Sequence, residues 1–212
     1  EIRLSLVGSE MCIRDRYGYD YEIEVDERDR PLITHRIEKD GSKSFVCSYE
    51  YYGDIIKSFK REDGYETNRD IVDGKVVRDY DNKGNEICFK YDDRGNIIEK
   101  IANTINKKGT EYFKFDELNR LIESSNDSGY VKKISYYDDT ENIKHTEDSL
   151  GMEYDYYING NIKNHRDKTN GISYTMEYYD DNSPKFYADN RGTVIEYNID
   201  GTIAKMVKSK NK

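Results

Sequence analysis

The chain has 212 residues, of which 36% are charged and 35% hydrophobic, and its formal net charge is -9. This acidic balance argues against a nucleic-acid-binding protein, and no apolar run of about 18 residues predicts a membrane span. This low hydrophobic fraction approaches the composition of disordered chains. The 21 tyrosines nevertheless allow a thin β-sheet, in which the rings pack and the hydroxyl groups remain in water.

The first sixteen residues differ from the rest of the chain. Residues 6–16 read LVGSEMCIRDR, and the DNA that encodes this string resembles an adapter used in transposase-based sequencing libraries. We therefore interpret residues 1–16 as a sequencing artefact and exclude them from reasoning about the fold. Residues 17–212 are expected to be one array of about nine repeats, truncated at both ends.

Glycines recur at two positions of a repeat about 21 residues long, a period typical of repeat architectures. Because glycine tolerates positive φ, this spacing predicts two tight turns and two short strands per repeat. The repeats counted in this way start at Val25, Tyr49, Asp70, Tyr91, Phe115, Tyr137, Tyr156, Tyr178 and Tyr197. One glycine series lies four residues after a repeat start: Gly53, Gly74, Gly95, Gly160 and Gly201. The other lies 14 to 18 residues after one: Gly41, Gly64, Gly84, Gly109, Gly129, Gly151, Gly171 and Gly192.

The segments between these turns alternate in polarity. Ile172, Tyr174, Met176 and Tyr178 alternate with polar residues, and similar alternation follows Gly192. Period-two alternation rich in isoleucine and tyrosine is typical of half-buried strands. The predicted fold class is all-β, with repeated β-hairpins in a long, curved, strip-like antiparallel sheet.

The repeat units share a recognisable motif. The unit at Tyr91 reads YDDRGNIIEK, and related units are YEYYGDIIK at Tyr49, YYINGNIK at Tyr156 and YNIDGTIAK at Tyr197. The pattern Tyr-Asp-x-x-Gly-Asn/Arg-Ile/Leu resembles the YD repeat of bacterial Rhs (rearrangement hotspot) and wall-associated proteins, over residues 17–212. The family's proteolytic core uses Asp-Pro motifs, and this sequence contains none.

The resemblance implies a function in enclosure. In Rhs and related toxin proteins, hairpins assemble into a β-shell around a toxic C-terminal domain. It implies a non-catalytic structural segment whose partners are further repeats and the toxin cargo of its own parent chain. It also implies a secreted or cell-surface location.

Each motif position has an expected structural role. The tyrosine is expected to end a strand, and Gly95 or Asn119 to take the left-handed conformation that closes the turn. Where Glu141 replaces this glycine, the turn must differ locally. The motif aspartates Asp92, Asp116 and Asp138 are expected to bond the turn backbone, and Ile97, Leu121 and Ile143 to start the returning strand.

No residue pattern predicts catalysis, a cofactor or a metal site. The sequence has no Gly-rich phosphate loop, nucleophile elbow or Cys-x-x-Cys. Cys47 and Cys88 are expected to be free thiols. His145 and His165 follow Ile143 and Ile162 closely, and we expect both histidines to occupy equivalent, outward-facing positions. The paired aspartates at residues 92–93, 138–139 and 180–181 recur at the same turn position, which favours a role in turn structure.

Two other functions remain open. Exposed tyrosines stack on sugar rings in many proteins, so a module that binds carbohydrate or the cell wall is one alternative. The segment EYDYYINGNIK at residues 153–163 also resembles MORN-type repeats of small antitoxin-like proteins.

Overall fold

The computed structural model describes residues 4–7, 10–14 and 18–208, with side chains for residues 18–208. All helix-or-strand structure in these ranges is β-strand, and the paired strands are antiparallel. The predicted all-β hairpin repeat is therefore confirmed. Tyr17 and parts of the 6–16 segment lie outside the described residues, and the adapter origin of this segment stays a prediction.

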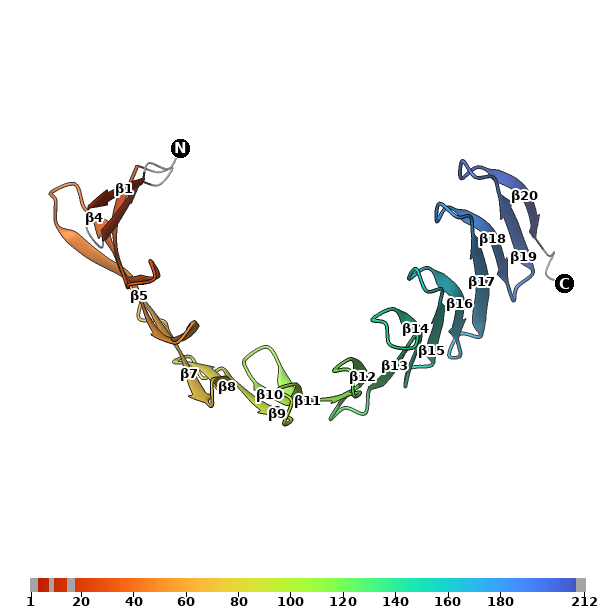
Figure 1. Ribbon diagram of the computed structural model, residues 1–212, viewed down its shortest axis with the longest axis horizontal. Helices are drawn as coiled ribbons and strands as arrows, with labels where there is room; N and C mark the ends of the chain where they lie inside the picture. The colour runs from red at the N-terminus through yellow and green to blue at the C-terminus, as the bar shows by residue number, and fades with distance from the viewer. Residues whose placement is uncertain (1–3, 8–9, 15–17, 209–212) are drawn as a thin grey trace. The chain divides into compact units, whose positions relative to one another are not determined.

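The chain divides into two units, which we describe separately. The first contains Glu1–Lys90 and Lys100–Lys108, and its successive strands pair in chain order (Figure 1). They are β1 (Leu4–Val7), β2 (Glu10–Arg14), β3 (Asp20–Val25), β4 (Pro31–Ile37), β5 (Lys43–Tyr52), β6 (Ile55–Arg61), β7 (Glu66–Val72), β8 (Lys75–Asp81) and β9 (Glu86–Tyr91). Strand β10 (Ile97–Asn103) is divided between the units.

The second unit contains Tyr91–Glu99 and Gly109–Lys212. Its strands also pair one after the next. They are β11 (Lys108–Phe115), β12 (Leu121–Asn126), β13 (Val131–Tyr136), β14 (Ile143–Asp148), β15 (Met152–Tyr156), β16 (Ile162–Asp167), β17 (Ile172–Tyr178), β18 (Pro184–Asp189), β19 (Thr193–Tyr197) and β20 (Ile203–Lys208).

The motif tyrosine coincides with a β-bulge. In β15, β17 and β19 the pairing register shifts at Tyr156, Tyr178 and Tyr197, each the last residue of its strand. A bulge adds one residue to one strand, which bends it and increases its twist. Tyr91 and Phe115 also end their strands.

Two predicted strand-end residues, Tyr49 and Tyr137, are out of register. Tyr49 lies inside β5, and Tyr137 lies just beyond β13. The bulges fall instead at Tyr51 and Tyr136. Consecutive tyrosines lie at the end of each of these strands, and each bulge adds one residue. The sequence spacing therefore does not show which tyrosine lies at the bulge.

The motif turns follow the expected chemistry at Asp92. The N–H of Gly95 donates to the Asp92 carbonyl at 3.0 Å. The Asp92 carboxylate accepts from the N–H groups of Arg94 and Asn96 at 3.0 and 2.8 Å. Gly95 has φ +93° and its counterpart Asn119 has φ +63°, so the expected left-handed conformation is confirmed at both positions.

The turn at residues 137–142 differs, as Glu141 in place of glycine predicted. Here Asp138 itself has a positive φ of +34°. The hydroxyl of Thr140 donates to the Tyr137 carbonyl at 2.7 Å and accepts from the Asn142 N–H at 3.2 Å. The expectation that Asp138 bonds the turn backbone is wrong, because this longer turn uses the threonine.

Gly109 is not a turn residue. The turn before it runs from Thr104, whose N–H donates to the Lys107 carbonyl at 2.8 Å, and Gly109 lies within β11. A Cβ at this position would lie 3.1 Å from a carboxylate oxygen of Asp127. The Asp127 side chain accepts from the N–H of Thr110 at 2.9 Å. Glycine therefore permits a close approach here.

The sheet has no thick core. Within residues 18–208, the buried side chains are Ala102, Thr146, His165 and Asp167. Most tyrosines are half-buried. Stability must therefore come from strand pairing and from contacts between neighbouring hairpins, as in other repeat proteins.

Candidate functional site

An aromatic row crosses four neighbouring strands of the second unit. The ring centroids of Tyr154 and His165 are 4.6 Å apart, those of His165 and Tyr174 are 4.9 Å apart, and those of Tyr174 and Tyr187 are 5.5 Å apart. Tyr187 also lies opposite Ile195 on the next strand. Cross-strand aromatic pairs are the main stabilising unit of a sheet face. This row links four successive strands of the second unit through ring contacts.

His165 belongs to this row, so the prediction that it faces outward is wrong. It is only 9% exposed, whereas His145 pairs with Asp155 on the opposite, polar face. His145 lies two residues after Ile143, but His165 lies three residues after Ile162. This difference in parity places the two histidines on opposite faces.

A polar row crosses five strands on the other face. In register order it consists of Ser135, His145, Asp155, Asn164 and Thr175. His145 Nδ1 lies 2.8 Å from Asp155 Oδ1, Asn164 donates to Asp155 Oδ2 at 3.1 Å, and Thr175 donates to Asn164 at 3.0 Å. Burial acts to raise the pKa of Asp155, but the bonds from His145 and Asn164 outweigh it and lower the pKa.

The first three members of this row are the residue types of a serine-histidine-aspartate triad. In the described part of the chain, however, no hydrogen bond joins Ser135 to His145. The contacts that the row does make are cross-strand hydrogen bonds among His145, Asp155, Asn164 and Thr175. Sequence reasoning missed it, because these residues become neighbours only through the strand register.

Tyrosine hydroxyls join successive hairpins along the edge formed by the motif turns. At three motif turns of the second unit, the tyrosine that follows the bulge donates to a backbone carbonyl of the next hairpin. The three bonds run from Tyr137 to Tyr156 at 2.5 Å, from Tyr157 to Met176 at 3.2 Å and from Tyr179 to Tyr197 at 2.7 Å. A lysine amine lies over each ring at 5.7 to 5.8 Å from its centroid: Lys144, Lys163 and Lys185.

Arginines make the corresponding link where the residue that follows the strand is aspartate. Arg94 donates to the Asp116 carbonyl at 2.6 Å, and Arg120 donates to the Asp138 carbonyl at 2.6 Å. In the first unit, Arg30 donates to the Gly53 carbonyl and lies over the Tyr51 ring at 4.2 Å. Tyrosine and arginine thus make the same kind of link, from a motif turn to the next hairpin.

Replacing Tyr179 with phenylalanine tests this link. The hydroxyl is lost while the ring stays, so we expect the free energy of unfolding to fall by about 1 kcal/mol, the net value of one hydrogen bond. Urea denaturation followed by circular dichroism measures it. Tyr52, which is 51% exposed, provides the control, because Tyr52→Phe should change stability little. Equal effects at both positions would refute the link.

The opposite edge, formed by the return turns, is joined by amide side chains. Asn190 donates to the Gly171 carbonyl at 2.7 Å and accepts from the N–H of Ser173 at 3.0 Å. In the first unit, Asn82 makes the same pair of bonds with Gly64 at 2.6 Å and Glu66 at 3.3 Å. Gly171 and Gly64, two of the predicted return-turn glycines, therefore supply carbonyl groups to the next hairpin. All glycines of both predicted series have positive φ, from +58° at Gly53 to +147° at Gly109.

The turn carboxylates are stabilised in their ionised form. The side-chain hydrogen bond from Arg30 lowers the pKa of Asp26 to about 2, and the bond from Arg61 lowers the pKa of Asp63 to about 2. The pKa of Asp92 is lowered by the Asn96 side chain, and that of Asp189 by the Thr193 backbone.

These shifts predict acid lability. The pKa values in the folded state lie below that of a free aspartate, about 3.9, so the unfolded chain binds more protons in this range. The stabilisation is complete above pH of about 4 and is lost as pH falls toward about 2. The thermal midpoint should fall steadily in this window, and less steeply in Asp63→Asn. A midpoint that does not change with pH in this window would contradict the prediction.

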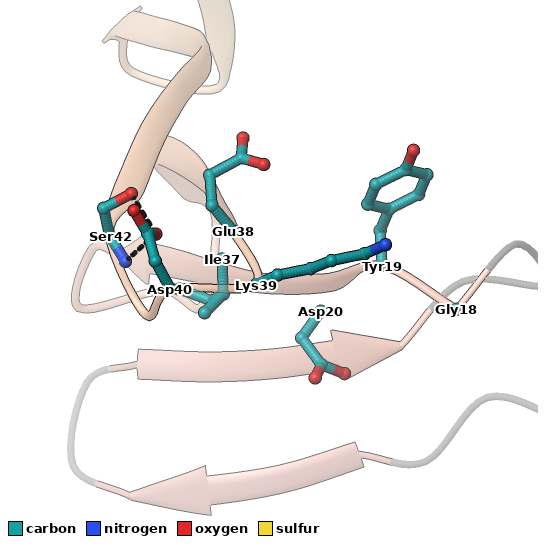
Figure 2. Close-up of a pocket in the computed structure, with 8 residues that line it drawn as sticks. All are labelled: Gly18, Tyr19, Asp20, Ile37, Glu38, Lys39, Asp40 and Ser42. Carbon is teal, nitrogen blue, oxygen red and sulfur yellow. Dashed lines mark hydrogen bonds between the residues drawn. The ribbon is translucent and has the colours of Figure 1, made fainter.

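The hollows on the surface of the described residues are open to solvent. One of about 880 Å³ lies beside Gly18, Tyr19, Asp20 and Lys39. Figure 2 shows the Lys39 side chain extended toward Tyr19, while Asp40 accepts hydrogen bonds from Ser42. These residues do not form a nucleophile, base and oxyanion site of the kind that catalysis requires.

A second hollow of about 450 Å³ lies between two successive motif turns of the second unit. Its lining includes Tyr157, Tyr178 and Asn182, and Ile158, which is 57% exposed. The rings of Tyr157 and Tyr178 meet edge to face at 6.0 Å. Asn159 donates to Asn182 at 2.7 Å across the gap.

The described ranges contain neither a metal-binding cluster nor a membrane-spanning helix. Residues 18–208 contain no group of three histidine, cysteine, aspartate or glutamate side chains arranged to hold a metal ion. Cys47 and Cys88 are free thiols there. None of the described segments forms a helix with the length and apolar character needed to cross a membrane.

The chain is similar in sequence to part of a bacterial nuclease. No protein-family model matches the chain. In sequence it is 29% identical over 139 residues to the tRNA3(Ser)-specific nuclease WapA of Bacillus spizizenii, a match that takes in 58% of this chain and 6% of that protein.

Solved structures share the fold. The chain is similar to the crystal structure of TcdB2-TccC3, with a TM-score of 0.51 and 12% identity over 88% of this chain and 14% of that one. It is equally similar to the Photorhabdus luminescens Tc holotoxin pore, with a TM-score of 0.51 and 12% identity over 88% of this chain and 13% of that one. The chain thus spans a small part of each relative.

Proposed function

The resemblance to YD-repeat segments of Rhs-type toxin proteins is confirmed, and from it we propose that this chain is a non-catalytic structural segment of a longer bacterial protein. Its hairpins form part of a β-shell that encloses the toxic cargo of the same parent chain. The parent protein is secreted or displayed on the cell surface. Its partners are further repeats and the cargo domain.

The observation that carries the proposal is the repeated connection of each hairpin to the next at both edges. Tyr137, Tyr157 and Tyr179 supply it at the motif edge, and Asn190 supplies it at the return edge. Such contacts are made only with neighbouring hairpins, so a sheet built from them extends by addition of repeats. A sheet that grows by addition of repeats can become large enough to enclose a cargo domain.

The proposal is tested by limited proteolysis of the full parent protein. We expect its C-terminal region to resist protease in the intact chain and to be cleaved after deletion of residues 108–208, which removes hairpins from the wall. Restoring the deletion with an equal number of hairpins from elsewhere in the same protein should restore protection. Cleavage at the same rate in all three chains would refute enclosure.

Carbohydrate binding is a second candidate, favoured by the hollow at Tyr157 and Tyr178. Its tyrosine rings and the side-chain amides of Asn159 and Asn182 are the groups that stack on and hydrogen-bond to sugars. Co-sedimentation with insoluble peptidoglycan should then fall when Tyr178 is replaced by alanine. Absence of co-sedimentation by the unmodified protein excludes this candidate for peptidoglycan.

A further inference from the structure

Two Asn-Gly pairs lie in turns of the second unit, at Asn159-Gly160 and Asn170-Gly171, and all four residues are exposed. In such a pair the backbone nitrogen of glycine attacks the side-chain carbonyl carbon of asparagine. A C–N bond forms to give a succinimide, and the amide nitrogen leaves as ammonia with the proton from the backbone nitrogen. Water then opens the ring to aspartate or isoaspartate. Glycine favours the attack because it has no side chain to obstruct the ring.

The hydrogen bonds at Asn159 oppose this reaction. The attacking nitrogen is engaged, because the N–H of Gly160 donates to the Tyr157 carbonyl at 2.9 Å. The side-chain carbonyl is engaged as well, since Asn159 Oδ1 accepts from the N–H of Asn161 at 3.2 Å. Its amide group donates to Asn182 at 2.7 Å. The attacking nitrogen, the side-chain carbonyl and the leaving amide group are therefore all held by hydrogen bonds.

The corresponding atoms at Asn170 have a different environment. Within residues 18–208, the N–H of Gly171 makes no hydrogen bond, and Asn170 Oδ1 accepts none. The amide group of Asn170 donates to Asp167 Oδ2 at 2.6 Å, and its backbone N–H donates to Asp167 Oδ1 at 3.0 Å. Both the nucleophile and the carbonyl that it attacks are thus free.

We propose that Asn170 is a site of spontaneous deamidation in the folded protein, and that it reacts faster than Asn159. The chemistry requires only water as a co-reactant. Breaking one backbone hydrogen bond of about 1 kcal/mol at Gly160 lowers the reactive population about fivefold. Asn170 should therefore deamidate at least about fivefold faster.

The product changes the return turn between β16 and β17. Asp167, which is only 7% exposed, loses the amide donor of Asn170 and gains a carboxylate as a neighbour. Isoaspartate also lengthens the backbone by one methylene beside Gly171, whose carbonyl accepts the bond from Asn190. Deamidation thus adds negative charge and weakens a connection between two hairpins.

The test follows both sites in one sample of the whole chain. The protein is incubated at neutral pH, digested and analysed by mass spectrometry, with fragmentation that distinguishes aspartate from isoaspartate. Circular dichroism of the same sample verifies the folded state. A parallel incubation in concentrated urea provides the control, because both pairs have the same Asn-Gly chemistry once the fold is lost.

We expect the two rates to be similar in urea and to differ at least about fivefold in the folded chain, with Asn170 faster. Equal rates in the folded chain, or a faster Asn159, would overturn the proposal. So would protection of both sites in the folded chain. Gly171→Ala, whose methyl group obstructs ring closure, should slow the modification at residue 170 without changing the rate at Asn159.

Discussion

Replacing Tyr174 with alanine is expected to lower the free energy of unfolding by about 2–3 kcal/mol. Tyr174 is the central ring of the aromatic row and contacts both His165 and Tyr187. Its removal exposes apolar surface on two neighbouring strands, and the thin sheet has no second layer to fill the gap. The magnitude is below that for a fully buried ring because Tyr174 is half-buried. Urea denaturation followed by far-ultraviolet circular dichroism measures it.

Tyr174→Phe is the matched control. It keeps the ring and removes only the hydroxyl, so stability should change by less than about 0.5 kcal/mol. A loss in Tyr174→Phe equal to that in Tyr174→Ala would mean that the hydroxyl, and not the ring packing, stabilises the row.

Replacing Gly95 with valine is expected to cost about 1–3 kcal/mol. Gly95 has φ +93°, a conformation that a β-branched residue adopts only with strain. The turn also depends on its N–H, which donates to the Asp92 carbonyl at 3.0 Å. The same denaturation measurement applies.

Asn119→Gly controls for the turn position. Asn119 occupies the equivalent site with φ +63°, so glycine there should be tolerated with a change within about 0.5 kcal/mol. If Gly95→Val costs less than about half of the lower expected value, the positive φ at this turn is not a determinant of stability.

The two candidate functions place different demands on the same edge. Enclosure requires the tyrosine links between hairpins to hold, whereas carbohydrate binding requires the hollow beside Tyr157 and Tyr178 to admit a ligand. Tyr137→Phe removes one link, and Tyr137 is not among the residues that line the hollow. This variant should therefore weaken the sheet while leaving any co-sedimentation with peptidoglycan unchanged.

The turns and strands were predictable from sequence because they depend on local chemistry. Gly95 and Asn119 mark turns through the φ values that they tolerate, and Asp92 bonds the backbone of its own turn. Ile97, Leu121 and Ile143 begin their strands as predicted. Each of these features involves residues within about five positions of one another.

The positions of the bulges were harder to predict from the sequence. The tyrosine pairs at residues 51–52 and 136–137 left the bulge position ambiguous by one or two residues. Gly109 was assigned to a turn, whereas a close contact with Asp127 explains it. This contact joins residues 18 apart in sequence, and turn propensity, which depends on neighbouring residues, cannot predict it.

The sequence by itself determined that this protein is a series of β-hairpins, because glycine spacing and period-two alternation act within single turns and strands. Only the tertiary structure decided which residues share a face and which hydroxyl groups connect the hairpins. His165 joins the aromatic row and Tyr179 reaches the carbonyl of Tyr197. The physical reason is that each bulge shifts the pairing by one residue, and one residue is enough to move a side chain to the other face of the sheet.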